Sequence, residues 1–176
     1  VLLEYAGMKS PEYLAINPMG KVPAIKHGDT VVTEVAAICA YLADQFPEHS
    51  LAPALSDPMR GTYYRWLFFT AGPVEMAVTA KSMQWEVPPE RQAMVGFGNE
   101  ALVINALEGA LQNGDWICGE QFTAADVYLG AQLHWGLMFG TVEKRPIFED
   151  YVARLQARPA SQRAFAIDAA LIAGKG

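Results

Sequence analysis

The chain has 176 residues, of which 52% are hydrophobic and 18% are charged, so it can fill the core of one large or two small domains. Its formal net charge of −6 and the lack of any basic run argue against a nucleic-acid partner. No apolar stretch approaches the length needed to cross a membrane, so we expect no membrane partner either.

The cysteines and histidines exclude further classes of protein. Cys39 and Cys118 lie far apart and form no C-x-x-C pair, which excludes a disulfide framework and a thioredoxin-type redox pair and favours a reducing cytoplasm. Cys39 falls within an apolar helical pattern, which predicts an inert buried thiol. His27, His49 and His134 lack the spacing of metal ligands, so we expect no metal site.

The first elements in chain order are a strand and a short helix. Residues Val1 to Tyr5 have the composition of a strand that begins abruptly. Ser10 followed by Pro11 predicts a helix start, with serine as the N-cap and proline at the first helical position. The Asn17-Pro18 turn should end this helix.

The next stretch combines a turn with an interrupted strand. A strand is expected from Val22 to Ile25, although Pro23 cannot donate to a sheet and confines the strand to an edge or marks a special peptide bond. If the Val22-Pro23 bond is cis, the N–H and C=O groups of Val22 turn outward and can pair with an extended peptide ligand. The simpler interpretation is an edge strand that ends in a proline.

A second short strand at Val31 and Val32 leads into a helix that opens at Thr33-Glu34 and ends near Phe46. A helix N-terminus offers free N–H groups and a positive dipole end to a carboxylate, while Glu34 offers a charge to an amine. A peptide ligand with both groups close together would suit this arrangement. Alternatively, Glu34 interacts only with the helix dipole.

Helices dominate the rest of the chain. Residues 47–57 show no periodicity and predict a linker, after which a long helix begins at Asp57-Pro58 and is kinked at Pro73. Pro88-Pro89 should end this helix and open the next, which stops at Asn113-Gly114.

Thr123 and Asp126 have the spacing of a capping box, and Phe122 and Val127 have that of a hydrophobic staple. They predict a buried helix that runs through Phe139. Two further helices are expected, at residues 146–158 and 160–172, separated by the Arg158-Pro159-Ala160 break.

These motifs together resemble the cytosolic glutathione S-transferase family of the bacterial type. The resemblance rests on Asn-Pro-x-Gly-Lys-Val-Pro-Ala-Ile at residues 17–25, on Thr-Glu-x-Ala-Ala-Ile-x-x-Tyr-Leu at residues 33–42, and on the Thr-x-x-Asp box at residues 123–126, and it covers essentially the whole chain. It implies an α/β thioredoxin-like N-terminal domain followed by an all-α C-terminal domain. The implied boundaries are residues 1–46 for the first domain, 47–57 for the linker and 58–176 for the helical domain.

The resemblance also implies which residues bind glutathione. Val22, before the cis-proline Pro23, would hold the cysteinyl backbone, and Glu34 would hold the γ-glutamyl group. The family's serine after this acidic residue is Val35 here, so the hydroxyl contact is missing although the backbone N–H remains. Lys21 could reach a glutathione carboxylate, or it is simply a solvated turn lysine.

In the family a first strand and a first helix precede the position of Val1, and they carry the residue that activates the glutathione thiol. We therefore expect about thirty residues to be absent from this sequence, an estimate from one strand, one helix and their turns. The catalytic residue is accordingly unassigned. The helix after the linker lines the electrophile pocket in the family, which makes Tyr64, Arg65 and Phe68 candidates, although a packing role is an alternative for each.

The resemblance implies a dimeric, cytoplasmic detoxification enzyme, a transferase that joins the glutathione thiolate to a small hydrophobic electrophile with no other cofactor. Two alternatives remain open. One is a non-catalytic binding or scaffold protein on the same fold, and the other is a glutathione-dependent reductase or isomerase.

Overall fold

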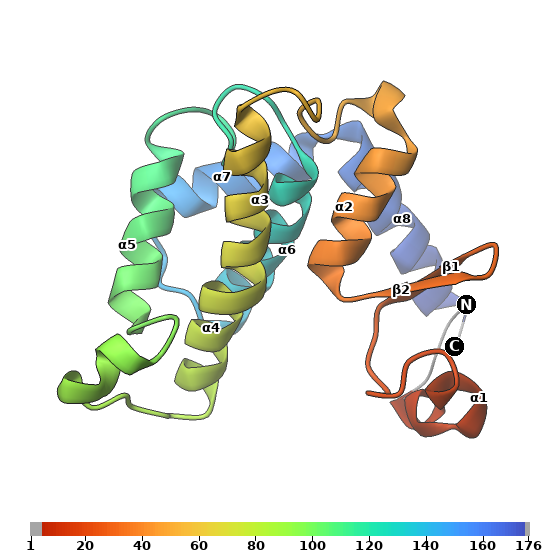
Figure 1. Cartoon of the computed structure of the whole chain (residues 1–176), viewed down its shortest axis with the longest axis horizontal. Coiled ribbons are helices and arrows are strands. Elements are labelled where there is room, and N and C mark those ends of the chain that lie inside the picture. Colours follow the sequence, from red (N-terminus) through yellow and green to blue (C-terminus); the bar gives the residue numbers. More distant parts are fainter. Residues whose placement is uncertain (1–4, 175–176) are drawn as a thin grey trace.

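The computed structural model describes residues 5–174, which form a small α/β part followed by a larger helical part (Figure 1). This is the fold class that the sequence predicts. The strand expected at the start of the chain lies outside the described residues except for Tyr5, which belongs to a 3-10 turn. In chain order the helices and strands are α1 (Pro11–Leu14), β1 (Ala24–His27), β2 (Thr30–Thr33), α2 (Val35–Gln45), α3 (Met59–Phe69), α4 (Glu75–Ser82), α5 (Glu100–Leu111), α6 (Ala124–Phe139), α7 (Pro146–Ala157) and α8 (Pro159–Ala173).

Strands β1 and β2 pair as an antiparallel hairpin, with Ala24 opposite Thr33 at its open end. The turn contains Gly28, whose φ of +59° lies in the left-handed region that glycine adopts without strain. The sequence predicts that this strand begins at Val22, but β1 begins at Ala24. The reason is that Pro23 has no N–H to donate to the ladder.

The long helix predicted after the linker is divided into α3 and α4. A π-helical turn, Thr70–Val74, joins the two and contains Pro73, so the predicted kink is confirmed. At the start of α3, the Asp57 carboxylate accepts the N–H of Met59 at 2.9 Å. Pro73 therefore interrupts the regular α-helix without ending it, since α4 continues from Glu75.

The C-terminal end of α4 differs from the prediction. The helix ends at Ser82 and does not continue to Pro88. Gln84 adopts a left-handed φ of 55°, and the N–H of Trp85 donates to the C=O of Ala80 at 2.8 Å. Helices commonly end in this way with a glycine in the left-handed conformation. Here Gln84 takes that position, and because glutamine is not a typical helix-ending residue, the sequence pattern did not predict the stop.

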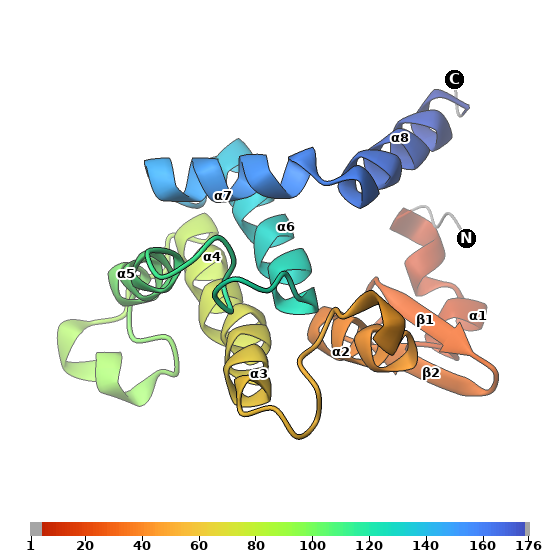
Figure 2. The same cartoon turned by 90° about the horizontal axis from the view of Figure 1, so that it is seen from above.

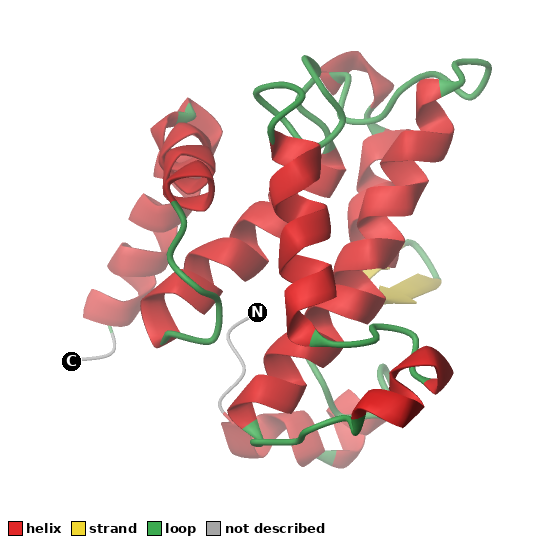
Figure 3. Cartoon of the chain, turned by 90° about the vertical axis from the view of Figure 1, so that its left-hand side faces the viewer, coloured by secondary structure: helices red, strands yellow, loops and turns green. Residues whose placement is uncertain are grey.

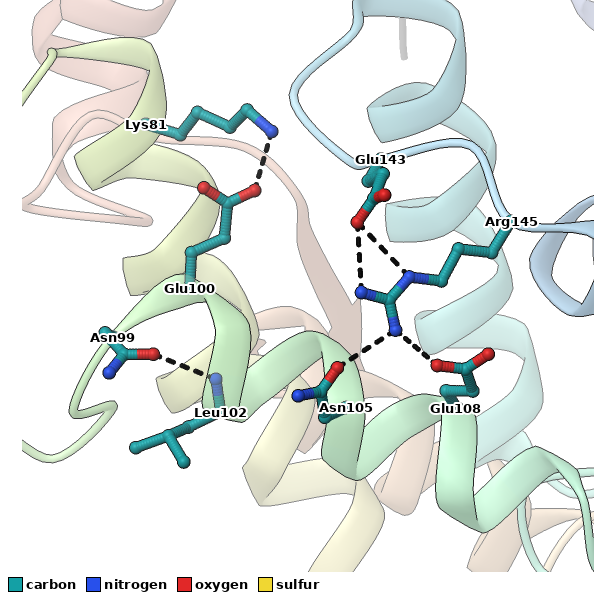
Figure 4. A network of polar contacts seen from close by, with 8 residues as sticks. All are labelled: Lys81, Asn99, Glu100, Leu102, Asn105, Glu108, Glu143 and Arg145. Carbon is teal, nitrogen blue, oxygen red and sulfur yellow. Dashed lines mark hydrogen bonds and ion pairs between the residues drawn. The ribbon is translucent and has the colours of Figure 1, made fainter.

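The predicted start of the next helix at Pro88-Pro89 is also wrong. The segment Pro89–Met94 forms only a 3-10 turn, and Gly98 takes a left-handed φ of +66° immediately before α5. The true N-cap is Asn99, whose side-chain oxygen accepts the N–H of Leu102 at 2.9 Å (Figure 4).

The predicted capping box at the head of α6 is confirmed. The Thr123 hydroxyl accepts the N–H of Ala125 at 3.3 Å, and the Asp126 carboxylate accepts the N–H of Thr123 at 2.8 Å. Asp126 also accepts the N–H of Ile117 at 2.7 Å and the hydroxyl of Tyr151 at 2.8 Å. Both box residues are fully buried, so this network ties α6 to the preceding loop and to α7.

Helix α6 lies near the centre of the molecule and packs against α2, α3 and α7 (Figure 2), and helices make up most of the fold (Figure 3). The core is therefore mainly helical, and α2 joins the hairpin to it. No helix among residues 5–174 has both the length and the apolarity needed to cross a bilayer. The largest fully buried apolar side chains are Tyr63, Leu67, Val74, Leu107, Leu129, Leu133, Phe148 and Tyr151.

Candidate functional site

The open end of the hairpin brings two predicted site segments together. Since Ala24 pairs with Thr33 at that end, the preceding residues Val22 and Pro23 and the following residue Glu34 extend beyond it side by side. Figure 1 shows β2 leading directly into α2 at this point. The sheet register therefore places an extended backbone segment beside a helix N-terminus.

Val22 presents its backbone at this end. The Val22–Pro23 peptide bond is cis, and the Val22 side chain is 55% exposed. Among residues 5–174, no hydrogen bond uses the N–H or the C=O of Val22. Both groups are therefore available to pair with an extended ligand, as an additional strand would.

Helix α1 and its following turn hold the chain just before Val22. The hydroxyl of Tyr13 and the side-chain amide of Asn17 both donate to the C=O of Lys21, at 2.6 Å and 2.9 Å. Tyr13 and Asn17 are buried, whereas the Lys21 side chain is exposed. These two positioning residues were missed from the sequence, where Asn17 indicated only a turn.

Gly20 makes this close approach possible. Its φ is +58°, and a Cβ atom there would lie 2.7 Å from both the Met8 carbonyl oxygen and the Lys9 ammonium. Lys9 in turn donates to the C=O of Met19 at 3.1 Å. The turn before Lys21 therefore requires glycine both for conformation and for space.

Glu34 and the start of α2 supply the other half of the site. The first helical hydrogen bond runs from the N–H of Ile38 to the C=O of Glu34 at 2.9 Å, which leaves the N–H groups of Val35, Ala36 and Ala37 outside the helix ladder. No side chain caps this end. With the positive end of the helix dipole, these donors can bind a carboxylate, and the exposed Glu34 can bind an amine.

Glu34 is also strained. Its φ of 68° and ψ of 122° are unusual for a residue with a side chain, and such outliers concentrate at binding and active sites. Sequence reasoning identified the charge of Glu34 but not this backbone conformation. Glutamate gives no local sign of a left-handed backbone, so nothing in the sequence could have predicted it.

Val35 turns away from the open end. Its side chain is partly buried and packs against the helical core, as does that of Cys39 one turn later. Burial raises the pKa of the Cys39 thiol to about 11, so it stays protonated at neutral pH. Val35 therefore offers only its backbone N–H to a ligand, as the sequence predicts, and Cys39 is placed as the inert thiol that was expected.

The residues predicted for an electrophile pocket lie on the exposed side of α3. Tyr64 and Phe68 have ring centroids 6.4 Å apart, and the guanidinium of Arg65 lies 4.5 Å from the ring centroid of Trp66. Phe68 is 67% exposed. None of the three predicted side chains lines the four cavities found along α4 and between α6, α7 and α8, so their role stays a prediction.

Metal chemistry finds no support among residues 5–174. No three His, Cys, Asp or Glu side chains in this part of the chain gather closely enough to hold a metal ion. The open end of the hairpin offers the N–H and C=O groups of Val22, the N–H groups at the start of α2 and the exposed Glu34 carboxylate.

Comparison with known sequences identifies the family of the chain. Residues 2–45 match the model of the glutathione S-transferase N-terminal domain, and residues 66–159 match that of the C-terminal domain. Glutathione S-transferase GstA of Escherichia coli O157:H7 is 31% identical over 159 residues, which are 89% of this chain and 78% of that protein. The chain belongs to the glutathione S-transferase family. Another family member, glutathione S-transferase GST-4.5 of Xanthomonas campestris, is 28% identical over 76% of this chain and 68% of its own length.

Solved structures of the family share the fold. The glutathione transferase of Methylococcus capsulatus superposes with a TM-score of 0.77 at 29% identity, covering 95% of this chain and 84% of the other. A sphingomonad glutathione S-transferase, solved in complex with glutathione, superposes with a TM-score of 0.75 at 28% identity and covers 95% of this chain and 85% of its own.

Proposed function

We propose that this chain binds glutathione at the open end of the hairpin and transfers its thiolate to a small hydrophobic electrophile. The observation that carries the proposal is the sheet register, which sets the free peptide groups of Val22 beside Glu34 and the uncapped start of α2. Glutathione has a matching set of groups: a peptide backbone in the middle and, at the γ-glutamyl end, an amine close to a carboxylate.

In the proposed complex, the cysteinyl part of glutathione pairs with the N–H and C=O of Val22 in the manner of an added strand. The γ-glutamyl ammonium faces the Glu34 carboxylate, and the γ-glutamyl carboxylate accepts from the N–H groups at the start of α2, including that of Val35. Pro23 shapes this edge, and Lys21 reaches the carboxylate at the other end of the tripeptide. In the chemical step the glutathione thiol loses its proton, and the thiolate sulfur bonds to the electrophilic carbon while the leaving group departs with its electron pair. The residues of this chain orient the thiolate for that attack.

The proposal extends to the domain organisation, the pocket and the assembly. Residues 1–46 form the glutathione domain, residues 47–57 the linker and residues 58–176 the helical domain. The electrophile is an apolar molecule that contacts α3 through Tyr64, Phe68 and the stem of Arg65. In this proposal the active form is a cytoplasmic homodimer with a role in detoxification.

One observation favours a second candidate, a glutathione-binding scaffold without turnover. Val35 has no hydroxyl and its side chain packs against the core, so one contact to the γ-glutamyl carboxylate is absent. A hydrogen bond from a hydroxyl to an ionised carboxylate contributes about 1.5–3 kcal/mol, so its absence weakens glutathione binding without removing the other contacts.

Two measurements separate these functions. Calorimetric titration with glutathione tests the site, and the rate of glutathione conjugation to 1-chloro-2,4-dinitrobenzene tests turnover. We expect Glu34→Gln to weaken glutathione binding about tenfold through loss of a charge-assisted bond. Glu48→Gln, which removes an exposed carboxylate from the linker, is the matched control.

Binding that depends on Glu34 together with turnover supports the transferase. Glutathione binding without turnover would support the scaffold. Binding that is unchanged in Glu34→Gln would contradict the proposed site, whatever the turnover.

A further inference from the structure

A second concave surface lies along α4. A cavity of about 670 Å³ is enclosed by the C-terminal half of α4, the segment from Met83 to Asn99 and the start of α5. A second cavity of about 310 Å³ adjoins the π-helical turn before α4. Phe97 lines both cavities, and we call the combined surface the α4 groove. No residue of the hairpin or of α2 contributes to it.

One end of the α4 groove is apolar. Pro73 and Met76 on the helix side face Val95 and Phe97 on the other side, and Met76 is 43% exposed. The segment that forms this second wall contains no helix beyond the 3-10 turn Pro89–Met94. Long segments without regular structure in a compact domain are often binding loops. The apolar cleft beside this segment is therefore a candidate binding site for a small molecule.

The other end is aromatic and acidic. Trp85 is 57% exposed, and Glu86 and Glu100 line the same cavity. The Lys81 ammonium forms an ion pair with the Glu100 carboxylate (Figure 4), with 2.6 Å between the two atoms. Because Lys81 is the one cation among the residues lining this cavity, it compensates one of the two carboxylates, and the groove keeps a negative charge.

We propose that the α4 groove binds an amphipathic organic cation. Its apolar body lies against Pro73, Met76 and Phe97, and its ammonium group lies between the Trp85 indole and the Glu86 carboxylate. An ammonium is attracted to the face of an indole and to the uncompensated carboxylate, whereas a carboxylate ligand is repelled by the same charge. This site is separate from the proposed glutathione site and does not depend on it.

Three probes with one apolar body test the charge preference. 4-Phenylbutylamine, 4-phenyl-1-butanol and 4-phenylbutyrate are titrated calorimetrically into the full chain at low salt. We expect the amine to bind about tenfold more tightly than the acid, with the alcohol between them, because the charged head contributes by cation–π and ion-pair attraction. Equal affinities for the three probes would overturn the proposal.

Matched variants locate the site. Trp85→Ala should weaken amine binding about tenfold by removing the indole face. Trp135→Ala removes a similarly exposed tryptophan that lies outside the groove and should leave amine binding unchanged. Glu86→Gln should weaken the amine but not the alcohol, and Glu120→Gln is its exposed control.

Equal loss in Trp85→Ala and Trp135→Ala would show that the amine binds elsewhere and would overturn the proposal. Competition between saturating glutathione and the amine would do the same, since the groove shares no residue with the hairpin end. If the groove instead binds a second copy of the chain, Trp85→Ala will reduce the dimer fraction in sedimentation equilibrium, and titration with the amine will release no heat of binding. That result would also overturn the proposal.

Discussion

Helices α2 and α6 begin in similar sequence contexts, Thr-Glu-Val-Ala and Thr-Ala-Ala-Asp, but their first turns differ in structure. At α6 the Thr123 and Asp126 side chains accept from backbone N–H groups, and both are fully buried. At α2 no side chain caps the helix, and Glu34 is exposed with a left-handed φ. One helix start is closed by its own chain, and the other is left open.

The difference follows from burial. Unpaired donors at the head of α6 would be cut off from water, so the fold must satisfy them internally. Burial raises the pKa of the Asp126 carboxyl, and hydrogen bonds from Ile117, Thr123 and Tyr151 oppose this rise by stabilising the charged form. At the edge of the molecule, water can satisfy the donors of α2 until a ligand replaces it. A closed helix start therefore stabilises the fold, while an open one is suited to binding.

The largest expected effect comes from opening the closed end. Asp126→Ala removes the acceptor of the Ile117 and Thr123 N–H groups and of the Tyr151 hydroxyl, and leaves these donors buried. We expect the free energy of unfolding to fall by about 3–5 kcal/mol, measured by urea denaturation. Glu120→Ala, an exposed carboxylate in the preceding loop, should change it by less than about 0.5 kcal/mol. A similar small loss for Asp126→Ala would contradict the network.

The two cysteines offer a second comparison, since one lies near each helix start. Burial raises the pKa of both Cys39 and Cys118 to about 11. At pH 8 the thiolate fraction should therefore be about a hundredfold below that of a free thiol, and alkylation by iodoacetamide should slow by about that factor. Mass spectrometry follows each site, with the urea-unfolded chain as control. Fast labelling of Cys39 alone would show that the open end extends further into α2 than the structure indicates.

Relief of strain at the open end should stabilise the fold and weaken binding. Glu34→Gly can adopt φ 68° without the steric cost that a side chain carries, so we expect the free energy of unfolding to rise by about 1 kcal/mol. Glutathione binding should weaken because the carboxylate is lost. Glu34→Ala loses the same charge but keeps the strain, and should gain no stability. Equal free energies of unfolding for the glycine and alanine variants would contradict the claim that the backbone of Glu34 is strained.

The smallest expected effect concerns the support of Val22. Tyr13→Phe removes one of the two donors to the Lys21 carbonyl and leaves Asn17 in place. Thermal unfolding should show a loss of about 0.5–1.5 kcal/mol, and calorimetry should show a loss of glutathione affinity within about tenfold. Tyr5→Phe, an exposed tyrosine on the preceding turn, is the control. Unchanged glutathione affinity in Tyr13→Phe would show that Asn17 alone holds this segment.

The α4 groove is a third surface, and the amine probes test it. The segment that encloses it, between α4 and α5, is the part of the chain that the sequence predicted least well. The pattern predicted one helix up to Pro88 and another from Pro89, because two prolines are the strongest local signal there. The structure ends α4 at Ser82 through a left-handed Gln84 and begins α5 only after Asn99. The segment that encloses the groove therefore could not be recognised from local sequence signals.

The sequence by itself determined the features that rest on local chemistry. The capping box, the proline kink in α3–α4 and the Ser10 cap were correctly predicted, because each depends on side chains a few residues from the backbone groups they contact. The charge of Glu34 and the proline after Val22 were visible in the same way. The family resemblance implied that these two positions bind one ligand, and the sheet register shows how they meet at one end of a hairpin. Only the tertiary structure decided that Tyr13 and Asn17 hold the Lys21 carbonyl and that Glu34 carries a left-handed φ. Such features depend on contacts between segments distant along the chain, and no residue records them in its own sequence neighbourhood.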